Sequence, residues 1–488
     1  MPTLRRSPDP GGRRVTRLAR VSPVAGLHRR RLTFWEVLAQ SVSALAPSAA
    51  MVTTPAIVLV QSGAATLPAF AAATVLVLLV GWCLTQFARR LAAVGGVYTY
   101  TAQGLGPSGA LVGGWSLAIG YAAVSMSALV GCALYLAALF SLPASAVAWL
   151  VLLVGGLAGW CTVRGIQLSA RVALALEVVS IGLVLAVLGV LLLRVSPAAG
   201  SAAVVVDGDV RWGGLAIGVV LGVVGFMGFE SASVLGVEAQ RPLRSVPRAV
   251  LWTPAVAGVL FLAGTAAQVV LLRAAPLEVL LSPVPVDRLA AEIGPVAWAL
   301  EAGIAASFFA CVTGSVNALA RVLFSMGREG VLASALGRTH GRLGTPSMAL
   351  LLVLPVVVGV PFVALAGGFS GRGVLTGTLT VSAIGYVVAY VLVCVAMPLF
   401  LRRIGELTRA PLVGGVAAAG LWSVVLVVAV SGSGWADGRL AALVYLGALA
   451  PGLAWLGWLR LRRPVRLQRV GVYDEPTVAS VLPGSLAA

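Results

Sequence analysis

The sequence predicts an all-α protein that crosses a membrane twelve times. Of its 488 residues, 59% are hydrophobic and 10% are charged, and the mean hydropathy is +1.01. Soluble globular domains carry about 25% charged residues, so this composition excludes a soluble protein. Charges, prolines and glycine clusters divide the chain into stretches of roughly 20 apolar residues, the length that a spanning helix needs.

The expected spans follow one another with short connections. They lie near residues 33–61, 66–88, 110–140, 145–163, 169–193, 212–238, 249–272, 296–326, 346–367, 374–401, 411–430 and 439–459. Residues 1–32 and 461–488 flank them and are rich in arginine, glycine, proline and serine. Such segments bury too little apolar surface to fold alone, so we expect both to be tails.

The distribution of charge predicts the orientation of the spans. All 34 basic residues are arginines, and the net charge is +18. Arginine accumulates on the cytoplasmic side of membrane proteins and attracts anionic lipid head groups, so this charge indicates a membrane partner and no nucleic acid. With both termini cytoplasmic, the outside loops hold only six arginines, namely Arg194, Arg211, Arg273, Arg288, Arg372 and Arg439. No signal peptide is expected.

The stretch 218–248, GVVLGVVGFMGFESASVLGVEAQRPLRSVPR, indicates a helix that is broken inside the membrane. Gly222, Gly225 and Gly228 each weaken a helix by roughly 1 kcal/mol relative to alanine. Glu230 follows among small residues, and an ionisable side chain at membrane depth is costly enough to indicate a functional site. A glycine-lined packing surface with a snorkelling acid is the alternative.

A second break is expected in the first span, at residues 46–50. Pro47 removes a backbone donor there and clashes with the preceding turn. Interrupted helices at matching positions of two halves are typical of the substrate sites of secondary transporters. Helix N-termini suit a carboxylate, so we expect main-chain amides to bind one and carbonyls near Ala46 and residues 225–228 to bind an ammonium group. The predicted amides are those of Ser48, Ala49, Ala50 and Met51.

Several motifs resemble those of the amino acid-polyamine-organocation (APC) superfamily of permeases. They are ALAPSAAM in the first span, RRLAAVGGVYTYTAQGLGP with GGWSLAIGY, GFMGFESASVLGVEAQRPLRSVPRAV, and SVNALARVLFSMGREGVL with HGRLGTPSMA. The resemblance covers roughly residues 33–460. In the first span, APSAAM replaces the Gly-Ser/Thr-Gly turn of many members, so the geometry of carboxylate binding is expected to differ.

The resemblance implies the five-plus-five inverted-repeat fold of sodium-coupled neurotransmitter transporters (LeuT-like). The repeats would be residues 33–193 and 212–401, with two peripheral helices over 411–460. Substrate would lie between spans one, three, six, eight and ten. By the same resemblance, Phe226 looks like the aromatic gate over the substrate, and Glu230 like a proton-sensing acid.

Other residues are weaker candidates for the site. Glu177 lies mid-span with no neighbouring base except Arg171 nearer the inner end, and it could carry a proton. Some proton-coupled relatives hold a lysine in this region, and a structural role beside a serine or backbone group is the alternative. Ser307 stands where sodium-coupled relatives place hydroxyl ligands, although one hydroxyl does not predict sodium. Four aromatics of spans three and ten could face the cavity, with packing or an interfacial belt as the alternative, namely Tyr386, Tyr121, Tyr390 and Trp115. Asn317 and Arg321 are read as bracing a gate, while Glu36 and Glu301 are read as snorkelling or capping residues.

We therefore predict a bacterial plasma-membrane permease that moves an amino acid or related amine by alternating access, coupled to protons. An amino acid/amine exchanger and a non-transporting membrane sensor are the alternatives. A membrane enzyme is disfavoured because the two histidines, His28 and His340, lie outside the spans, and no cofactor is expected. The five cysteines stand singly, so neither a metal site nor a disulfide framework is indicated. Neutral or cationic substrates are favoured over acidic ones, because no arginine falls mid-membrane.

Overall fold

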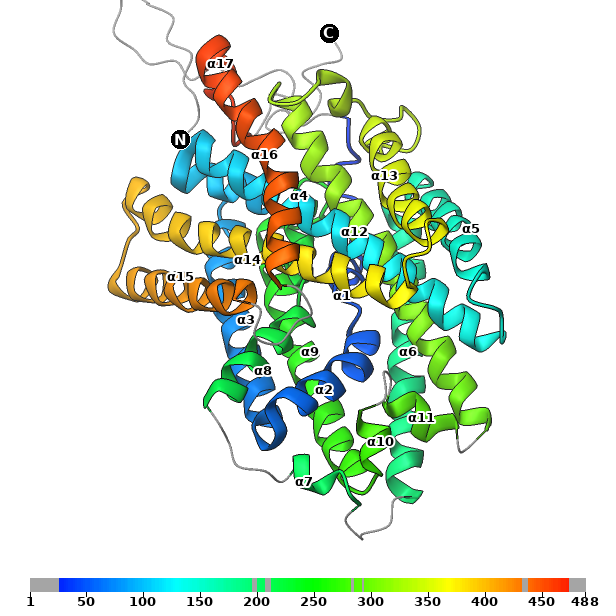
Figure 1. The fold of residues 1–488 in the computed structure, drawn as a ribbon. Coiled ribbons are helices and arrows are strands. Elements are labelled where there is room, and N and C mark those ends of the chain that lie inside the picture. Colours follow the sequence, from blue (N-terminus) through cyan, green and yellow to red (C-terminus); the bar gives the residue numbers. More distant parts are fainter. Residues whose placement is uncertain are drawn as a thin grey trace, which may run out of the picture.

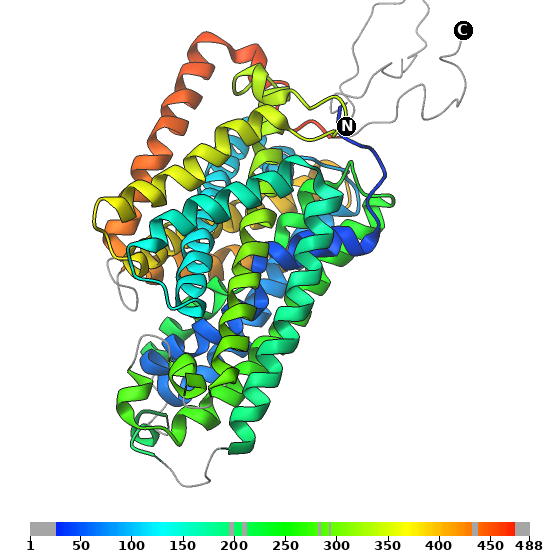
Figure 2. The same cartoon turned by 90° about the vertical axis from the view of Figure 1, so that its right-hand side faces the viewer.

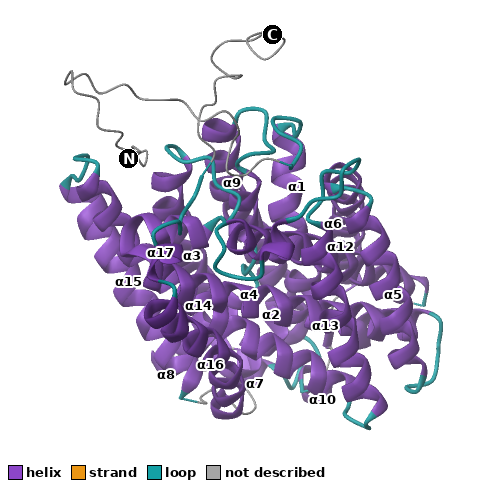
Figure 3. Ribbon diagram, turned by 90° about the horizontal axis from the view of Figure 1, so that it is seen from above, coloured by secondary structure: helices purple, strands orange, loops and turns teal. Residues whose placement is uncertain are grey.

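The computed structural model describes residues 26–194, 200–206, 212–281, 285–291, 294–431 and 438–473. These residues form helices and loops without a strand (Figure 3). Eleven helical stretches are long and apolar enough to span a membrane. One of them, Phe34–Ala88, has 55 residues and would extend about 80 Å if it were straight, so it includes two of the expected spans. The all-helical membrane class is confirmed, whereas the count of twelve and the inverted repeat stay predictions.

Most helix bounds lie within a few residues of the expected ranges. The helices are α1 (Phe34–Leu45), α2 (Pro47–Ser62), α3 (Thr66–Ala88), α4 (Val97–Leu139), α5 (Ala146–Val163), α6 (Ile166–Arg194), α7 (Ala203–Val206), α8 (Trp212–Val224), α9 (Pro242–Arg273), α10 (Leu277–Leu280), α11 (Pro285–Ala291), α12 (Pro295–Arg328), α13 (Ser347–Ala366), α14 (Gly371–Arg403), α15 (Arg409–Val430), α16 (Gly438–Arg462) and α17 (Pro464–Leu467). Short 3-10 turns are η1 (Gly63–Ala65), η2 (Phe229–Leu235) and η3 (Ser334–Gly337).

The third span begins earlier than expected. Helix continues back to Val97 instead of beginning at residue 110, with a kink at Gly106, whose φ is 76°. The residue before a proline is disfavoured in the α region, and Pro107 follows this glycine, so the kink separates a short helical arm from the spanning part. The arm contains polar residues such as Thr99 and Thr101, so a prediction from the length of apolar stretches does not include it in the span.

The broken elements lie at the centre of the bundle. α14 packs along α4, α12 packs against both α4 and α6, and α1 contacts α6, α12 and η2. The two ends of the described chain lie at the same end of the molecule, opposite to α7, α10 and α11 (Figures 1 and 2). An even number of crossings requires such an arrangement.

Candidate functional site

The first break is narrower than expected. It consists of one residue, Ala46, which has φ 52° and ψ 61° and thus the left-handed conformation. This conformation costs roughly 1–2 kcal/mol for a residue with a Cβ, and such strain clusters at functional sites. Residues 47–50 are already helical, with Pro47 in the first turn of α2, where the lack of an N–H is harmless. The break therefore ends α1 and begins α2 at a single position.

The first amides of α2 are bonded to side chains from distant helices. Glu177 of α6 accepts hydrogen bonds at its Oε1 from the backbone N–H of Ser48 (2.9 Å) and from the Ser48 hydroxyl (2.5 Å). The Ser307 hydroxyl of α12 accepts one from the Ala49 N–H (3.2 Å) and donates to the same Glu177 oxygen (3.1 Å). All of these side chains except Ala49 are fully buried, and Ala49 is 1% exposed. A carboxylate of the protein itself thus occupies the positive end of α2.

Three of the four amides predicted to bind a substrate carboxylate have other partners in this conformation, and the fourth, that of Met51, lies inside α2. Those of Ser48 and Ala49 are bonded to Glu177 and Ser307, and the Ala50 N–H donates to the carbonyl of Ala46 (3.1 Å). Met51 lies within α2, and its own carbonyl accepts from the Gln268 side chain (2.7 Å). The other oxygen of Glu177, Oε2, has no hydrogen-bond partner among the described residues.

The second break is built on glycine. α8 ends at Val224, and the chain turns at residues 225–228 before η2 begins at Phe229. Gly228 has φ 98°, and a Cβ there would lie 2.6 Å from the carbonyl oxygen of Ala44. Only glycine adopts this conformation readily and allows so close an approach. The two breaks therefore meet where α1 ends.

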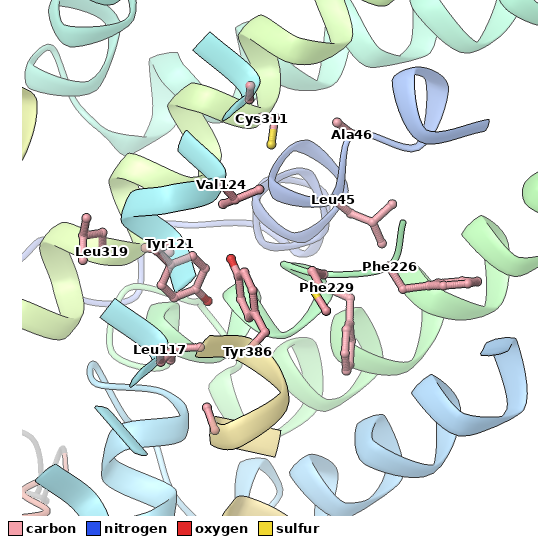
Figure 4. Close-up of a cluster of buried hydrophobic side chains, with 14 of the residues drawn as sticks. Leu45, Ala46, Leu117, Tyr121, Val124, Phe226, Phe229, Cys311, Leu319 and Tyr386 are labelled. Carbon is pink, nitrogen blue, oxygen red and sulfur yellow. The ribbon is translucent and has the colours of Figure 1, made fainter. Parts of the chain in front are cut away.

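The Phe226 ring lies on the α9 side of this break. It packs edge-on against Phe261, with ring centroids 4.7 Å apart, and it is directed away from Tyr121 and Tyr386 (Figure 4). The ring of this stretch that contacts Tyr390 belongs to Phe229, at 5.6 Å. A gating role of Phe226 stays a prediction.

Glu230 is held by two tyrosines from different helices. Its Oε1 accepts from the Tyr121 hydroxyl of α4 at 2.6 Å, and its Oε2 accepts from the Tyr390 hydroxyl of α14. All three side chains are fully buried. The sequence indicated that both tyrosines could face the cavity, but it did not pair them with Glu230. The one available signal was a buried acid that needs donors while no basic side chain stands nearby.

Tyr386 lies beside this group, and its hydroxyl is unpaired. The ring stands edge-on to Tyr121 at 5.3 Å and is fully buried (Figure 4). No described residue forms a hydrogen bond with its oxygen. Buried hydroxyls normally have a partner, and this one is among several buried hydroxyls without a partner in the described residues.

Buried polar contacts connect α1, α12 and the chain after η2. The Arg321 guanidinium donates to both oxygens of Glu238, at 2.7 and 3.1 Å, and to the carbonyl of Asn317 at 3.1 Å. The Gln40 side chain donates to the carbonyl of Gly314 at 2.7 Å. This geometry fits a bracing role for Asn317 and Arg321. Glu36 forms a capping box with Thr33, which confirms that it caps α1.

Sequence comparison places the chain in a family. The model of a family described as "Amino acid permease" matches residues 32–439. The branched-chain amino acid permease BcaP of Lactococcus lactis is 29% identical over 168 residues, which are 31% of this chain and 34% of that protein. The low-affinity putrescine importer PlaP of Escherichia coli is 24% identical over 300 residues, 58% of this chain and 64% of that protein. The matches thus span less than two thirds of either relative.

Structural comparison gives the same fold over most of the chain. A manganese transporter of Eremococcus coleocola, crystallised with an aromatic bis-isothiourea substituted compound, has a TM-score of 0.54 at 16% identity. The match covers 89% of this chain and 95% of that one. A mutant of the same transporter gives a TM-score of 0.55 over 90% of this chain. At such identity the likeness concerns the fold alone. The family match extends over most of the sequence, and the chain belongs to the amino acid permease family.

Proposed function

We propose that this protein carries an amino acid across a bacterial plasma membrane by alternating access, in symport with a proton. The observation that supports the proposal is the Glu177 carboxylate on the N–H groups that begin α2. A zwitterionic substrate would place its own carboxylate on the same amides, as expected at a helix N-terminus. Glu177 and the substrate would then compete for one site.

Charge explains how this competition couples substrate to proton. Two carboxylates close together in a buried site cannot both remain ionised. A substrate carboxylate that displaces Glu177 therefore favours the protonated form of Glu177, which has no ionic partner in the described structure. Substrate and proton enter together, and the number of negative charges beside α2 stays the same. Glu230, held by Tyr121 and Tyr390, would be the second coupling candidate.

Neutral amino acids fit this scheme best. The buried ring cluster of Phe229, Tyr386 and Tyr390 next to the breaks offers an apolar surface with one unpaired hydroxyl, and one relative is a branched-chain amino acid permease. The likeness to a putrescine importer favours an amine as the second candidate. An amine without a carboxylate would leave Glu177 in place on α2, so its transport would not depend on that residue.

Uptake into proteoliposomes tests the proposal. The full chain is reconstituted into proteoliposomes, and the uptake of externally added radiolabelled leucine, arginine, glutamate or putrescine is measured with and without an inward proton gradient. Wild type, Glu177→Gln and Glu230→Gln are compared, with Glu406→Gln as the matched control, since Glu406 pairs with Arg90 at the surface. The proposal predicts gradient-driven accumulation of a neutral amino acid in wild type and the control, and its loss in Glu177→Gln.

The remaining outcomes separate the alternatives. If gradient-driven uptake survives in Glu177→Gln but not in Glu230→Gln, the residue that carries the coupling proton is Glu230. Uptake that depends on an internal amine and ignores the gradient would indicate exchange. Substrate binding without accumulation or exchange would overturn transport and favour the sensor.

A further inference from the structure

A basic pocket lies where α9 begins. It has a volume of about 210 Å³ and is lined by Phe34, Gln240, Arg241, Arg244, Ser245 and Arg248. The arginines are spaced three and four residues apart, so they share one face of the first turns of α9. All three are exposed, whereas Ser245 is buried.

The electrostatics of this pocket are unfavourable without an anion. Arg241 is the N-cap of α9, and Arg244 lies in its first turn, where helix amides already carry partial positive charge and cations are disfavoured. The guanidinium groups of Arg241, Arg244 and Arg248 form no hydrogen bond or ion pair with another described residue. The Gln240 side chain donates to the backbone carbonyl of Arg31 at 3.4 Å, so the pocket borders the segment before α1. The pocket thus gathers three cations that no described side chain neutralises.

The surface of α9 that follows the pocket along the helix is suited to an acyl chain. Trp252, Val256 and Val259 continue the line of Arg244 and Arg248 along α9 at helical spacing, and they are 59%, 52% and 68% exposed. Trp35 of α1 is 65% exposed next to Phe34, and exposed tryptophans mark the boundary of the bilayer. An anion that is attached to a hydrocarbon chain would satisfy the arginines and cover this apolar stripe together.

We propose that the pocket binds the phosphate headgroup of an anionic phospholipid from the same leaflet. Gln240 also connects the pocket to the N-terminal segment, since its N–H donates to the carbonyl of Leu32 at 2.8 Å and the N–H of Leu32 donates to Glu238 at 2.9 Å. A bound headgroup therefore joins the start of α1 to the start of α9. The site does not depend on the proposed transport.

Native mass spectrometry of the full chain in detergent tests the site. Short-chain phosphatidylglycerol is titrated into wild type, into the triple variant Arg241→Gln/Arg244→Gln/Arg248→Gln, and into a control, Arg338→Gln/Arg342→Gln/Arg409→Gln, which removes three exposed arginines away from the pocket. Each arginine near a membrane surface is worth about a fivefold change in affinity, so the triple variant should bind about a hundredfold more weakly. The control should stay within about twofold of wild type. If the triple variant aggregates, the single variant Arg244→Gln replaces it, with an expected fivefold loss of lipid affinity.

Two further titrations identify the ligand. Phosphatidylcholine has the same phosphate with a compensating cation and should bind more weakly than phosphatidylglycerol to wild type, with little difference in the triple variant. An equal loss in the control would mean that lipid responds only to overall charge and would overturn the proposal. Displacement of the lipid by inorganic phosphate at equal concentration would make the site one for a soluble anion and would likewise overturn it.

Discussion

Arg321 and Glu238 form a two-pronged ion pair in which both side chains are almost completely buried, at 1% and 2% exposure. The pair joins α12 to the chain that follows η2. Bidentate contacts of this kind hold their two elements in one relative orientation. If the protein works by alternating access, we expect this pair to brace a gate at the end of the bundle where both described chain ends lie, and to break when the site opens there.

Removal of one partner should destabilise the protein strongly. Glu238→Gln leaves the Arg321 charge buried without a counter-charge, and such a loss costs about 3–5 kcal/mol. Glu406→Gln is the matched control, because its pair with Arg90 is exposed and contributes about 1 kcal/mol or less. Thermal melting in detergent should show a large fall for the first variant and a small one for the second. Equal shifts would mean that the buried pair contributes no more than the surface pair.

Gly228→Ala should damage the second break. The substitution forces a Cβ into a left-handed residue, at about 1–2 kcal/mol, and places it 2.6 Å from the Ala44 carbonyl oxygen. Gly182→Ala is the control, since nothing lies within 4 Å of its Cβ position inside α6, and it should stabilise the helix by up to about 1 kcal/mol. Melting temperatures should therefore move in opposite directions. If Gly228→Ala left the melting temperature unchanged, the break would tolerate another backbone conformation.

The three tyrosines around Glu230 should differ in their effects. Tyr121→Phe and Tyr390→Phe each leave one buried carboxylate oxygen without its donor, which costs about 1–3 kcal/mol. Tyr386→Phe removes a hydroxyl that has no partner in the described structure, so the melting temperature should change little. If Tyr386 binds substrate, this variant should still raise the KM for uptake. A large fall in its stability would assign the hydroxyl a structural bond instead.

Glu329 should make stability depend on pH. Burial raises the pKa of this carboxyl from 4.5 to about 7, against the opposing effect of donors from Tyr98 and the backbone of Gly471 and Val472. The folded state then holds a proton that the unfolded state has lost, so stability is greatest below about pH 4.5 and falls as the pH rises to about 7. Glu329→Gln should flatten the fall in melting temperature between pH 5 and pH 8.

A part of this slope should survive the substitution. Burial likewise raises the pKa of Asp287 to about 7, and its contribution has the same sign. Glu406→Gln, at the exposed pair with Arg90, should leave the slope unchanged. Parallel curves for wild type and Glu329→Gln would show that Glu329 titrates near its ordinary value.

Local features of the sequence predicted most of the helices and where the two breaks fall. Pro47 and Gly228 restrict or release backbone dihedrals at their own positions, and the capping box of Thr33 and Glu36 is likewise built within one turn. The lengths of the apolar stretches and the distribution of arginine can likewise be obtained from the order of residues alone. These signals are readable because covalent neighbours alone produce them.

Only the tertiary structure decided which side chains meet. Glu177 reaches Ser48 across 129 residues, and Tyr121 reaches Glu230 across 109. Such pairs depend on how each helix is rotated about its axis and where it crosses its neighbours, which is set by the packing of many side chains at once. The first turn of α2 was therefore predictable as a carboxylate site, while its occupation by the protein's own Glu177 was not. Helix N-termini attract any carboxylate, and only the folded bundle brings one within reach.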